Sequence, residues 1–258
     1  MNGRGTAGWI GSVAVLAALI ALWWGASTAG YVSRVFLPTP QATWASLLEG
    51  LNFTGQGNGE LWAFTQATVG RMVQGWLLAS LFGVLLGAAI GVSPAVRAWL
   101  QPTLEFIRPL PASALLPLAI SIFGLNPRMV LFVVAFGAMW PVLLATVHGF
   151  AAVEPRLSEV ARCLQLPRAA YVWKIGLPNA LPDILAGMRL SMTISLIVAV
   201  VGEMIASQSG LGQAILLAAR SFRASELFAG IALLGLIGFA SNALLALAEK
   251  KLLRWQHL

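Results

Sequence analysis

Charged residues are scarce in this chain of 258 residues. They make up 10% of it, against about 25% in ordinary soluble domains, while hydrophobic residues make up 59%. A surface with so few charges is atypical of a protein in water. It is typical of a protein in lipid, because each charge at mid-membrane costs roughly 2.5–3.5 kcal/mol. The composition therefore excludes a soluble globular domain and predicts a membrane protein.

Cysteine and histidine are almost absent. Cys163 is the single cysteine, and His148 and His257 are the two histidines. One thiol cannot form an intrachain disulfide, and so few of these side chains exclude a Cys-rich or His-rich metal site. We therefore expect no metal and no cofactor bound by this chain.

The chain also lacks the features of a nucleic-acid-binding protein and of an ATPase. Its net charge is +7, but the basic residues stand singly between apolar runs instead of forming one stripe. A phosphate-binding P-loop needs Gly-Lys-Ser/Thr, whereas Lys174, Lys250 and Lys251 follow Trp, Glu and Lys. The H-E-x-x-H motif of a metal-dependent membrane enzyme is absent too. We expect no nucleic-acid partner and no enzymatic activity, so any ATP hydrolysis must come from another chain.

Six apolar stretches are long enough to cross the hydrocarbon core, which takes about 20 helical residues. They are 9–27, 66–92, 104–124, 128–149, 184–206 and 227–248. The first is long for the apolar part of a signal peptide and no clear cleavage signal follows it, so we interpret it as a span. The predicted fold class is all-α: one polytopic transmembrane domain over residues 1–258, with its core at 60–250.

The distribution of basic residues predicts the orientation. With both termini in the cytoplasm, the inside segments hold nine basic residues and the outside segments hold four. The inside residues are Arg4, Arg97, Arg156, Arg162, Arg168, Lys174, Lys250, Lys251 and Arg254, and the outside residues are Arg34, Arg128, Arg220 and Arg223. We therefore expect cytoplasmic termini and a cytoplasmic loop between the fourth and fifth spans.

Two of the spans have unusual residues. Small residues recur at every fourth position of the second span, at Ala79, Gly83, Gly87 and Gly91, which predicts a helix face that another backbone can approach closely. The third span contains Pro102, Pro109, Pro111 and Pro117. Each proline removes a backbone donor and disfavours helical angles before it. We expect this segment to be broken and to lie inside the bundle or along a path, because broken helices are not tolerated against lipid.

Five ionisable residues fall within or at the ends of the spans: Arg71, Glu105, Arg108, Arg189 and Glu203. Such residues are candidates for function because a partner must offset their burial. One interpretation is that Arg–Glu pairs hold helices together, and the other is that an arginine meets an anionic solute on a translocation path. Arg108 is the stronger path candidate because it lies in the proline-broken segment, whereas Arg189 can extend to the membrane interface.

The longest charged interval, 154–182, separates the fourth and fifth spans. Leu157, Val160, Ala161 and Leu164 stand at positions i, i+3, i+4 and i+7, which predicts one apolar helical face. Pro167 is expected to stop this helix and to open a second one. The helix is too short to span a membrane, so it either lies on the membrane surface or docks a partner.

This interval resembles the EAA loop of binding-protein-dependent ABC transporter permeases. That pattern is E-A-A, three residues, G, nine residues and I-x-L-P, and the chain keeps its spacing with Glu159-Val160-Ala161 and Ile175-Gly176-Leu177-Pro178. Gln165 stands at the glycine position. Further segments resemble the nitrate/sulfonate/taurine/bicarbonate branch of the family in order and at similar spacing: Phe36-Leu37-Pro38-Thr39-Pro40, Phe106-Ile107-Arg108-Pro109-Leu110-Pro111, Gly187-Met188-Arg189-Leu190, Val201-Gly202-Glu203-Met204 and Ser209-Gly210-Leu211-Gly212.

The resemblance implies the permease subunit of an importer in a bacterial cell membrane. Its partners would be a second, identical permease chain, two cytoplasmic ATP-binding subunits that hold ATP and Mg²⁺, and an external solute-binding protein. The residues that the resemblance assigns to a cytoplasmic coupling helix or its surroundings are Leu157, Glu159, Val160, Ala161, Leu164, Gln165, Leu177 and Pro178. A positive backbone angle at Gln165 would cost about 1–2 kcal/mol, so either the turn differs here or the ATPase partner tolerates it.

The sequence does not identify the transported solute. A small anionic solute such as a sulfonate, taurine, nitrate or bicarbonate fits the branch, and small aromatic or vitamin-precursor solutes are alternatives. From another class, an ion channel or a membrane scaffold is possible, although no filter-like loop or ring of charges is found in the sequence.

Overall fold

The computed structural model describes residues 3–30, 33–51 and 59–254, with side chains from residue 11 onward. These residues are largely helical and contain no strand. Among them, five helices are long and apolar enough to cross a membrane, and a sixth span results if one bent pair of helices counts as one. The prediction of an all-α polytopic membrane protein is confirmed.

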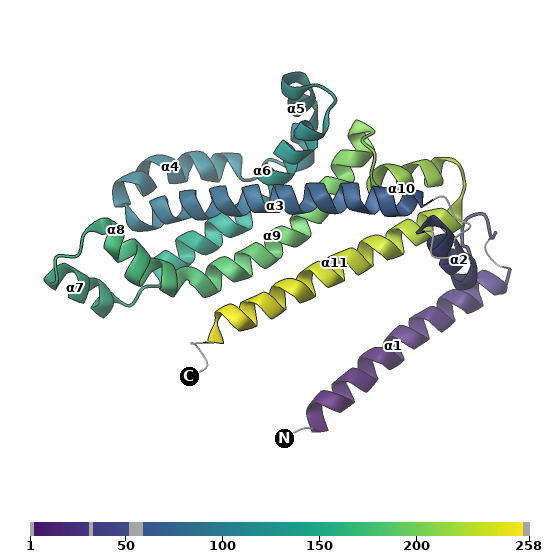
Figure 1. The fold of residues 1–258 in the computed structure, drawn as a ribbon, viewed down its shortest axis with the longest axis horizontal. Coiled ribbons are helices and arrows are strands. Elements are labelled where there is room, and N and C mark those ends of the chain that lie inside the picture. The colour runs from purple at the N-terminus through teal and green to yellow at the C-terminus, as the bar shows by residue number, and fades with distance from the viewer. Residues whose placement is uncertain (1–2, 31–32, 52–58, 255–258) are drawn as a thin grey trace. The chain divides into compact units, whose positions relative to one another are not determined.

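Figure 1 labels the helices along the chain. They are α1 (Gly3–Thr28), α2 (Pro40–Gly50), α3 (Glu60–Val92), α4 (Pro94–Ile107), α5 (Leu116–Phe123), α6 (Pro127–Ala151), α7 (Pro155–Cys163), α8 (Arg168–Tyr171), α9 (Leu177–Ala206), α10 (Leu211–Arg220) and α11 (Ala224–Leu252). A 3₁₀ turn, η1 (Ala112–Leu115), precedes α5, and a π-helical turn, η2 (Val172–Gly176), joins α8 to α9.

The chain forms two compact units. Unit 1 consists of Met1–Thr65 and Gln213–Gly235, and unit 2 consists of Gln66–Gly212 and Leu236–Leu258. Helices α3, α10 and α11 each have residues in both units.

Unit 1 is held in part by aromatic contacts. The Trp23 ring on α1 stacks on Phe228 of α11 at a centroid distance of 5.6 Å. The Trp23 indole N–H also donates to the Pro38 carbonyl oxygen at 3.0 Å. Pro38 lies just before α2, so these contacts fasten α1 to the segment that follows it.

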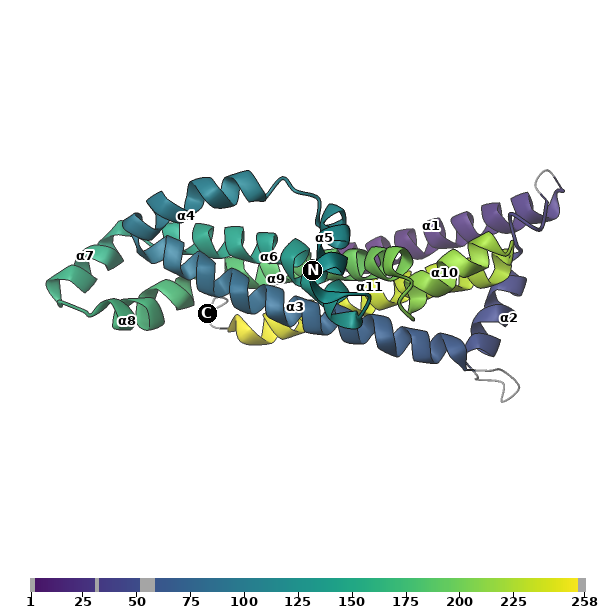
Figure 2. The same ribbon diagram turned by 90° about the horizontal axis from the view of Figure 1, so that it is seen from above.

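The core of unit 2 lies between α5, α6 and α9. Its buried residues are Leu116, Ala119, Met129, Val130, Val133, Val134, Ala199 and Ala206. Helices α6 and α9 lie along each other in both views (Figures 1 and 2). They contribute most of this core.

The small-residue face of α3 packs against α6, as the spacing predicts. A Cβ atom added at Gly83 would lie 2.8 Å from the Val142 Cβ, and one at Gly87 would lie 2.6 Å from the Thr146 Cβ. Distances below 3.0 Å are not tolerated by packed atoms, so only glycine allows the two backbones to come this close. The expected tight packing is confirmed, and its partner is a helix of the same chain.

The third apolar stretch differs from the predicted range 104–124. Helix α4 begins at Pro94, where the Ser93 side chain accepts a hydrogen bond from the Val96 amide. It ends at Ile107, and the next helical pair, η1 and α5, is bent from it by 87°. The break coincides with Pro109 and Pro111, which have no N–H to continue the helix. The expected break is confirmed, but the span starts ten residues earlier than predicted because Pro94 suits a first helical turn.

Candidate functional site

The coupling segment predicted from the sequence forms α7 and α8, at one end of unit 2 beyond the ends of α6 and α9 (Figures 1 and 2). Helix α7 begins with Pro155 in its first turn. It ends at Cys163, four residues before Pro167, so the prediction that Pro167 stops this helix is wrong. Pro167 instead precedes the first residue of α8.

A left-handed residue ends α7. Gln165 has φ +50°, and its amide donates to the Arg162 carbonyl oxygen at 3.0 Å. The next amide, of Leu166, donates to the Ala161 carbonyl oxygen at 3.0 Å. These two bonds form a Schellman motif, in which glycine is the usual left-handed residue. Glutamine therefore occupies the left-handed position of this turn, where the EAA pattern that the segment resembles has glycine.

The apolar face of α7 divides into an inward and an outward part. Ala161 is 5% exposed, whereas Leu157, Val160 and Leu164 are 43%, 52% and 66% exposed. Glu159 is exposed beside them. Three large apolar side chains on one helical surface outside the spans form a patch that nothing in the described chain covers. We call Leu157, Val160 and Leu164 the α7 patch.

The junction between α8 and α9 is fastened to the end of α6. The Asn179 side-chain amide donates to the Gly149 carbonyl oxygen at 3.0 Å. Gly176 lies under the Phe150 ring, where an added Cβ would come within 2.9 Å of Cδ1. Leu177 and Pro178, also predicted for this region, form the first turn of α9. These contacts therefore connect η2 and the start of α9 to the end of α6.

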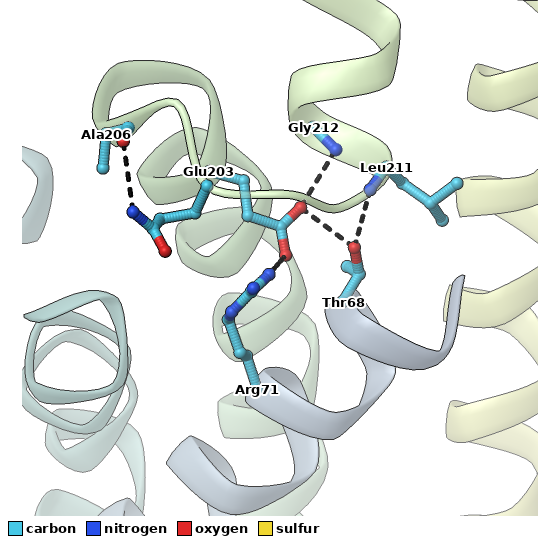
Figure 3. Close-up of polar contacts among 7 residues, drawn as sticks. Thr68, Arg71, Glu203, Ala206, Leu211 and Gly212 are labelled. Carbon is cyan, nitrogen blue, oxygen red and sulfur yellow. Dashed lines mark hydrogen bonds and ion pairs between the residues drawn. The ribbon is translucent and has the colours of Figure 1, made fainter. Parts of the chain in front are cut away.

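A second site surrounds Glu203, near the end of α9 (Figure 3). The Glu203 residue is fully buried, and its Oε1 accepts from Arg71 Nη1 at 2.5 Å. Its Oε2 accepts from the Thr68 hydroxyl at 2.9 Å and from the Gly212 amide at 3.0 Å. Thr68 also accepts a hydrogen bond from the Leu211 amide at 2.9 Å. The carboxylate thus joins α3 to the start of α10.

Two glycines allow this carboxylate to fit. A Cβ atom at Gly210 would overlap the Glu203 carboxylate, and one at Gly212 would overlap the Val200 carbonyl oxygen. The Ser-Gly-Leu-Gly segment noted in the sequence therefore turns tightly around the end of Glu203. Thr68 was not predicted, because a threonine within an apolar span gives no pattern to detect.

Arg189 on α9 forms an ion pair with Glu249 on α11. The Arg189 side chain is 38% exposed and that of Glu249 is 26% exposed. Glu249 was not singled out in the sequence because it adjoins the charged run at the end of the last span.

Glu105 and Arg108, on α4 and at its end, form no ion pair with each other. The Glu105 carboxylate instead accepts from the Gln101 side-chain amide at 2.7 Å. Both residues line a cleft of about 90 Å³ between α3, α4 and α6. The structure therefore brings these two predicted residues together at one cleft, apart from the Glu203 cluster and from the Arg189 pair.

Known proteins resemble this chain across almost its whole length. Residues 79–254 match the family described as "Binding-protein-dependent transport system inner membrane component". A putative aliphatic sulfonates transport permease protein of Bacillus subtilis (strain 168) is 34% identical over 99% of this chain and 91% of its own length. A taurine transport system permease protein of Escherichia coli (strain K12) is 32% identical over 95% and 89%.

Among solved structures, a chain of an amino acid ABC transporter crystallised with histidines has a TM-score of 0.61. It is 20% identical, and the match covers 80% of this chain and 98% of that chain. At this identity the likeness shows a shared fold alone. The family match, which includes α7 to α11, and the relatives aligned over nearly the full length show that this chain belongs to the binding-protein-dependent transport system inner membrane components.

Proposed function

We propose that this permease subunit imports a small solute with an anionic group, received from an external solute-binding protein and moved at the expense of ATP hydrolysed by a separate subunit. The relatives named for sulfonates and taurine support the solute class. The resemblance of 154–182 to the EAA loop supports the partner. The observation that carries the proposal is the exposure of the α7 patch.

The α7 patch has the character of a docking surface. Leu157 and Val160 lie on a nine-residue helix and Leu164 is its C-cap, while other positions of the helix include Arg156, Glu159 and Arg162. Burying a leucine or valine side chain stabilises a complex by about 1.5–3 kcal/mol, while an exposed ion pair adds only about 0–1 kcal/mol. Burial of these apolar side chains in a groove of the ATP-binding subunit therefore contributes most of the binding free energy, and Glu159 contributes little.

The burial of Ala161 refines the role of this residue. Its side chain is buried within the chain, and its small size fits that position. A large residue at this position would displace α7 and alter the position of the patch. Ala161 therefore shapes the interface, while Leu157, Val160 and Leu164 make it.

The assembly follows from the family. We infer two copies of this chain, two ATP-binding subunits on the cytoplasmic side and one solute-binding protein on the other side of the cell membrane. The excess of basic residues in the inside segments supports cytoplasmic termini and a cytoplasmic α7. In this arrangement, closure of the ATP-binding subunits reaches α6 and α9 through the contacts of Phe150 and Asn179.

Copurification of the whole importer tests the proposal. Val160→Asp and Leu164→Asp should each lose the ATP-binding subunit from the purified complex, because a carboxylate would be buried without a partner. Leu252→Asp is the matched control, since Leu252 is also an exposed apolar residue, at the last turn of α11. Retention of the ATP-binding subunit and of solute-stimulated ATP hydrolysis in both α7 variants would refute the docking surface.

A further inference from the structure

The break between α4 and η1 lies near the middle of a membrane-crossing helix. Helix α4 runs back alongside α3 from the end of that helix, and the break falls beside the middle of α3 in both views (Figures 1 and 2). Arg108 follows the fourteen residues of α4, which extend for about 21 Å at 1.5 Å per residue. Because α3 is long and apolar enough to cross the membrane, the break falls within the hydrocarbon core, which is about 30 Å thick.

This break is exposed in the single chain. No residue of α4 is buried, and Arg108, Pro109, Leu110 and Pro111 are exposed as well. Pro109 has no N–H, so the Glu105 carbonyl oxygen lacks the donor that a continuous helix provides. Irregular backbone at this depth is not tolerated against lipid and needs cover from protein or from a water-filled cavity. The single chain therefore leaves this segment without the cover that it needs.

The apolar side chains around the break favour protein over water as the cover. Leu118 and Ile122 are 54% and 62% exposed, and they share one face of α5 because they are four residues apart. Apolar side chains are stabilised by removal from water, so this face is a poor wall for a water-filled cavity. On α4, Trp99 and Phe106 are each 83% exposed and lie on the side opposite Arg108, as expected of a side that contacts lipid.

Glu105 and Arg108 make the remaining side of α4 complementary to a copy of itself. They are three residues apart and therefore neighbours on the helix surface. Neither forms an ion pair with any residue that the structure describes. A charge at this depth needs a partner of opposite sign. In a two-fold symmetric dimer, a contact of one residue with another is made twice, once in each direction, so the two charges can pair between two copies.

We propose that a second copy of this chain packs against the break between α4 and η1, with Glu105 of each copy paired to Arg108 of the other. Two reciprocal ion pairs then neutralise all four charges, and the second copy covers the exposed backbone. The site is incomplete in one chain, because each carboxylate receives its cation from the other chain. The inference rests on the proposed function, which includes two copies of this chain, and it locates the contact between them.

Charge reversal tests the reciprocal pairs. Two differently tagged copies of the full chain are expressed together without the ATP-binding subunit, which would otherwise hold two permease chains in one complex. One tag is used for purification in mild detergent, and the other measures how much of the second copy is retained. Glu105→Arg or Arg108→Glu in both copies should reduce retention at least about tenfold, because like charges then face each other.

The double variant and a control complete this test. Glu105→Arg/Arg108→Glu in both copies should restore retention, since the same pairs form again with their signs exchanged. Arg128→Glu makes the same change of charge at an exposed arginine in the first turn of α6. Its retention should match that of the wild type.

Disulfide cross-linking tests the contact without reversing any charge. In a Cys163→Ser background, one tagged copy carries Glu105→Cys and the other carries Arg108→Cys. Oxidation in native membranes should give a covalent dimer with both tags. In the control, Thr103→Cys replaces Glu105→Cys, because Thr103 is exposed on the side of α4 opposite Glu105. This pair should not cross-link.

Three results would overturn the contact. Wild-type retention in both single reversals would assign the break to a water-filled path instead. Loss of retention in the double reversal as well as in the single ones would exclude reciprocal pairing. Cross-linking through Glu105→Cys that does not exceed the Thr103→Cys control would place the second copy elsewhere. Failure of the proposed function is seen separately, as absence of the ATP-binding subunit when it is expressed and purified with the wild-type chain.

Discussion

Arg71 on α3 and Glu203 on α9 form a buried ion pair, with 2.5 Å between Arg71 Nη1 and Glu203 Oε1. The Arg71 side chain is 13% exposed and the Glu203 side chain is fully buried. The carboxylate also receives hydrogen bonds from Thr68 and Gly212, so both of its oxygens are satisfied. The pair and its hydrogen bonds tie α3 to the turn between α9 and α10.

Replacing one residue of this pair should destabilise the protein far more than replacing one residue of an exposed pair, and replacing both should cost less than the two single replacements together. Arg71→Gln leaves a buried carboxylate without its cation, which costs about 3–5 kcal/mol. The double variant Arg71→Gln/Glu203→Gln should lose less stability than the two single variants lose together, because its two side-chain amides can form a hydrogen bond with each other. Thermal unfolding of the detergent-purified chain measures this.

The exposed pair of Arg223 and Glu226 provides the control. These side chains are 54% and 49% exposed, so Arg223→Gln should change stability by no more than about 1 kcal/mol. Additive losses at Arg71 and Glu203 would show that the two side chains do not interact.

Gly87→Leu should prevent correct packing of α3 on α6. The Thr146 Cβ and the Leu143 carbonyl oxygen already occupy the space that a side chain would need. Gly70→Leu on the same helix should be tolerated, since nothing lies within 4 Å of a Cβ atom there. Yield and monodispersity on size-exclusion chromatography measure both, and equal behaviour of the two variants would contradict the packing described.

Gln165→Gly should stabilise the turn after α7. Release from the left-handed backbone strain of a non-glycine residue is worth about 1–2 kcal/mol, so the Leu166 amide should exchange with deuterium about 5–30-fold more slowly. Gln165→Val should exchange faster, because a β-branched residue fits this conformation least. Faster exchange in the glycine variant would mean that the glutamine side chain stabilises the turn.

Cysteine labelling tests the orientation of the chain. In a Cys163→Ser background, Ser221→Cys between α10 and α11 should react with an impermeant maleimide added to intact cells. Arg168→Cys at the start of α8 should react only after the membrane is opened. Labelling of Arg168→Cys in intact cells would place α7 outside and remove the basis for its docking to an ATP-binding subunit.

The sequence predicted the spans because lipid imposes a length and a composition that a single chain displays. It also predicted the break in the third span, since Pro109 and Pro111 act locally. Helix α10 was missed. It has only ten residues, and its position depends on the contact of Gly212 with Glu203, which no local pattern records.

The same distinction applies to the candidate sites. The apolar face of α7 could be predicted from spacing, but the burial of Ala161 depends on tertiary contacts that spacing does not record. Arg71 and Glu203 were recognised as isolated charges, whereas their pairing joins residues 132 positions apart. Glu105 and Arg108 are close enough in sequence to suggest an ion pair, yet the Glu105 carboxylate accepts a hydrogen bond from Gln101 instead.

The long separation of Arg71 from Glu203 has a consequence for biosynthesis. Ribosomes add about 5–20 residues per second, so Glu203 is made roughly 7–26 s after Arg71. Throughout this interval Arg71 has no carboxylate partner, and an unpaired charge at mid-membrane costs roughly 2.5–3.5 kcal/mol. We therefore expect the nascent α3 to be less stable in lipid until α9 is synthesised. The ion pair with Glu203 can stabilise α3 in the membrane only after α9 has been synthesised.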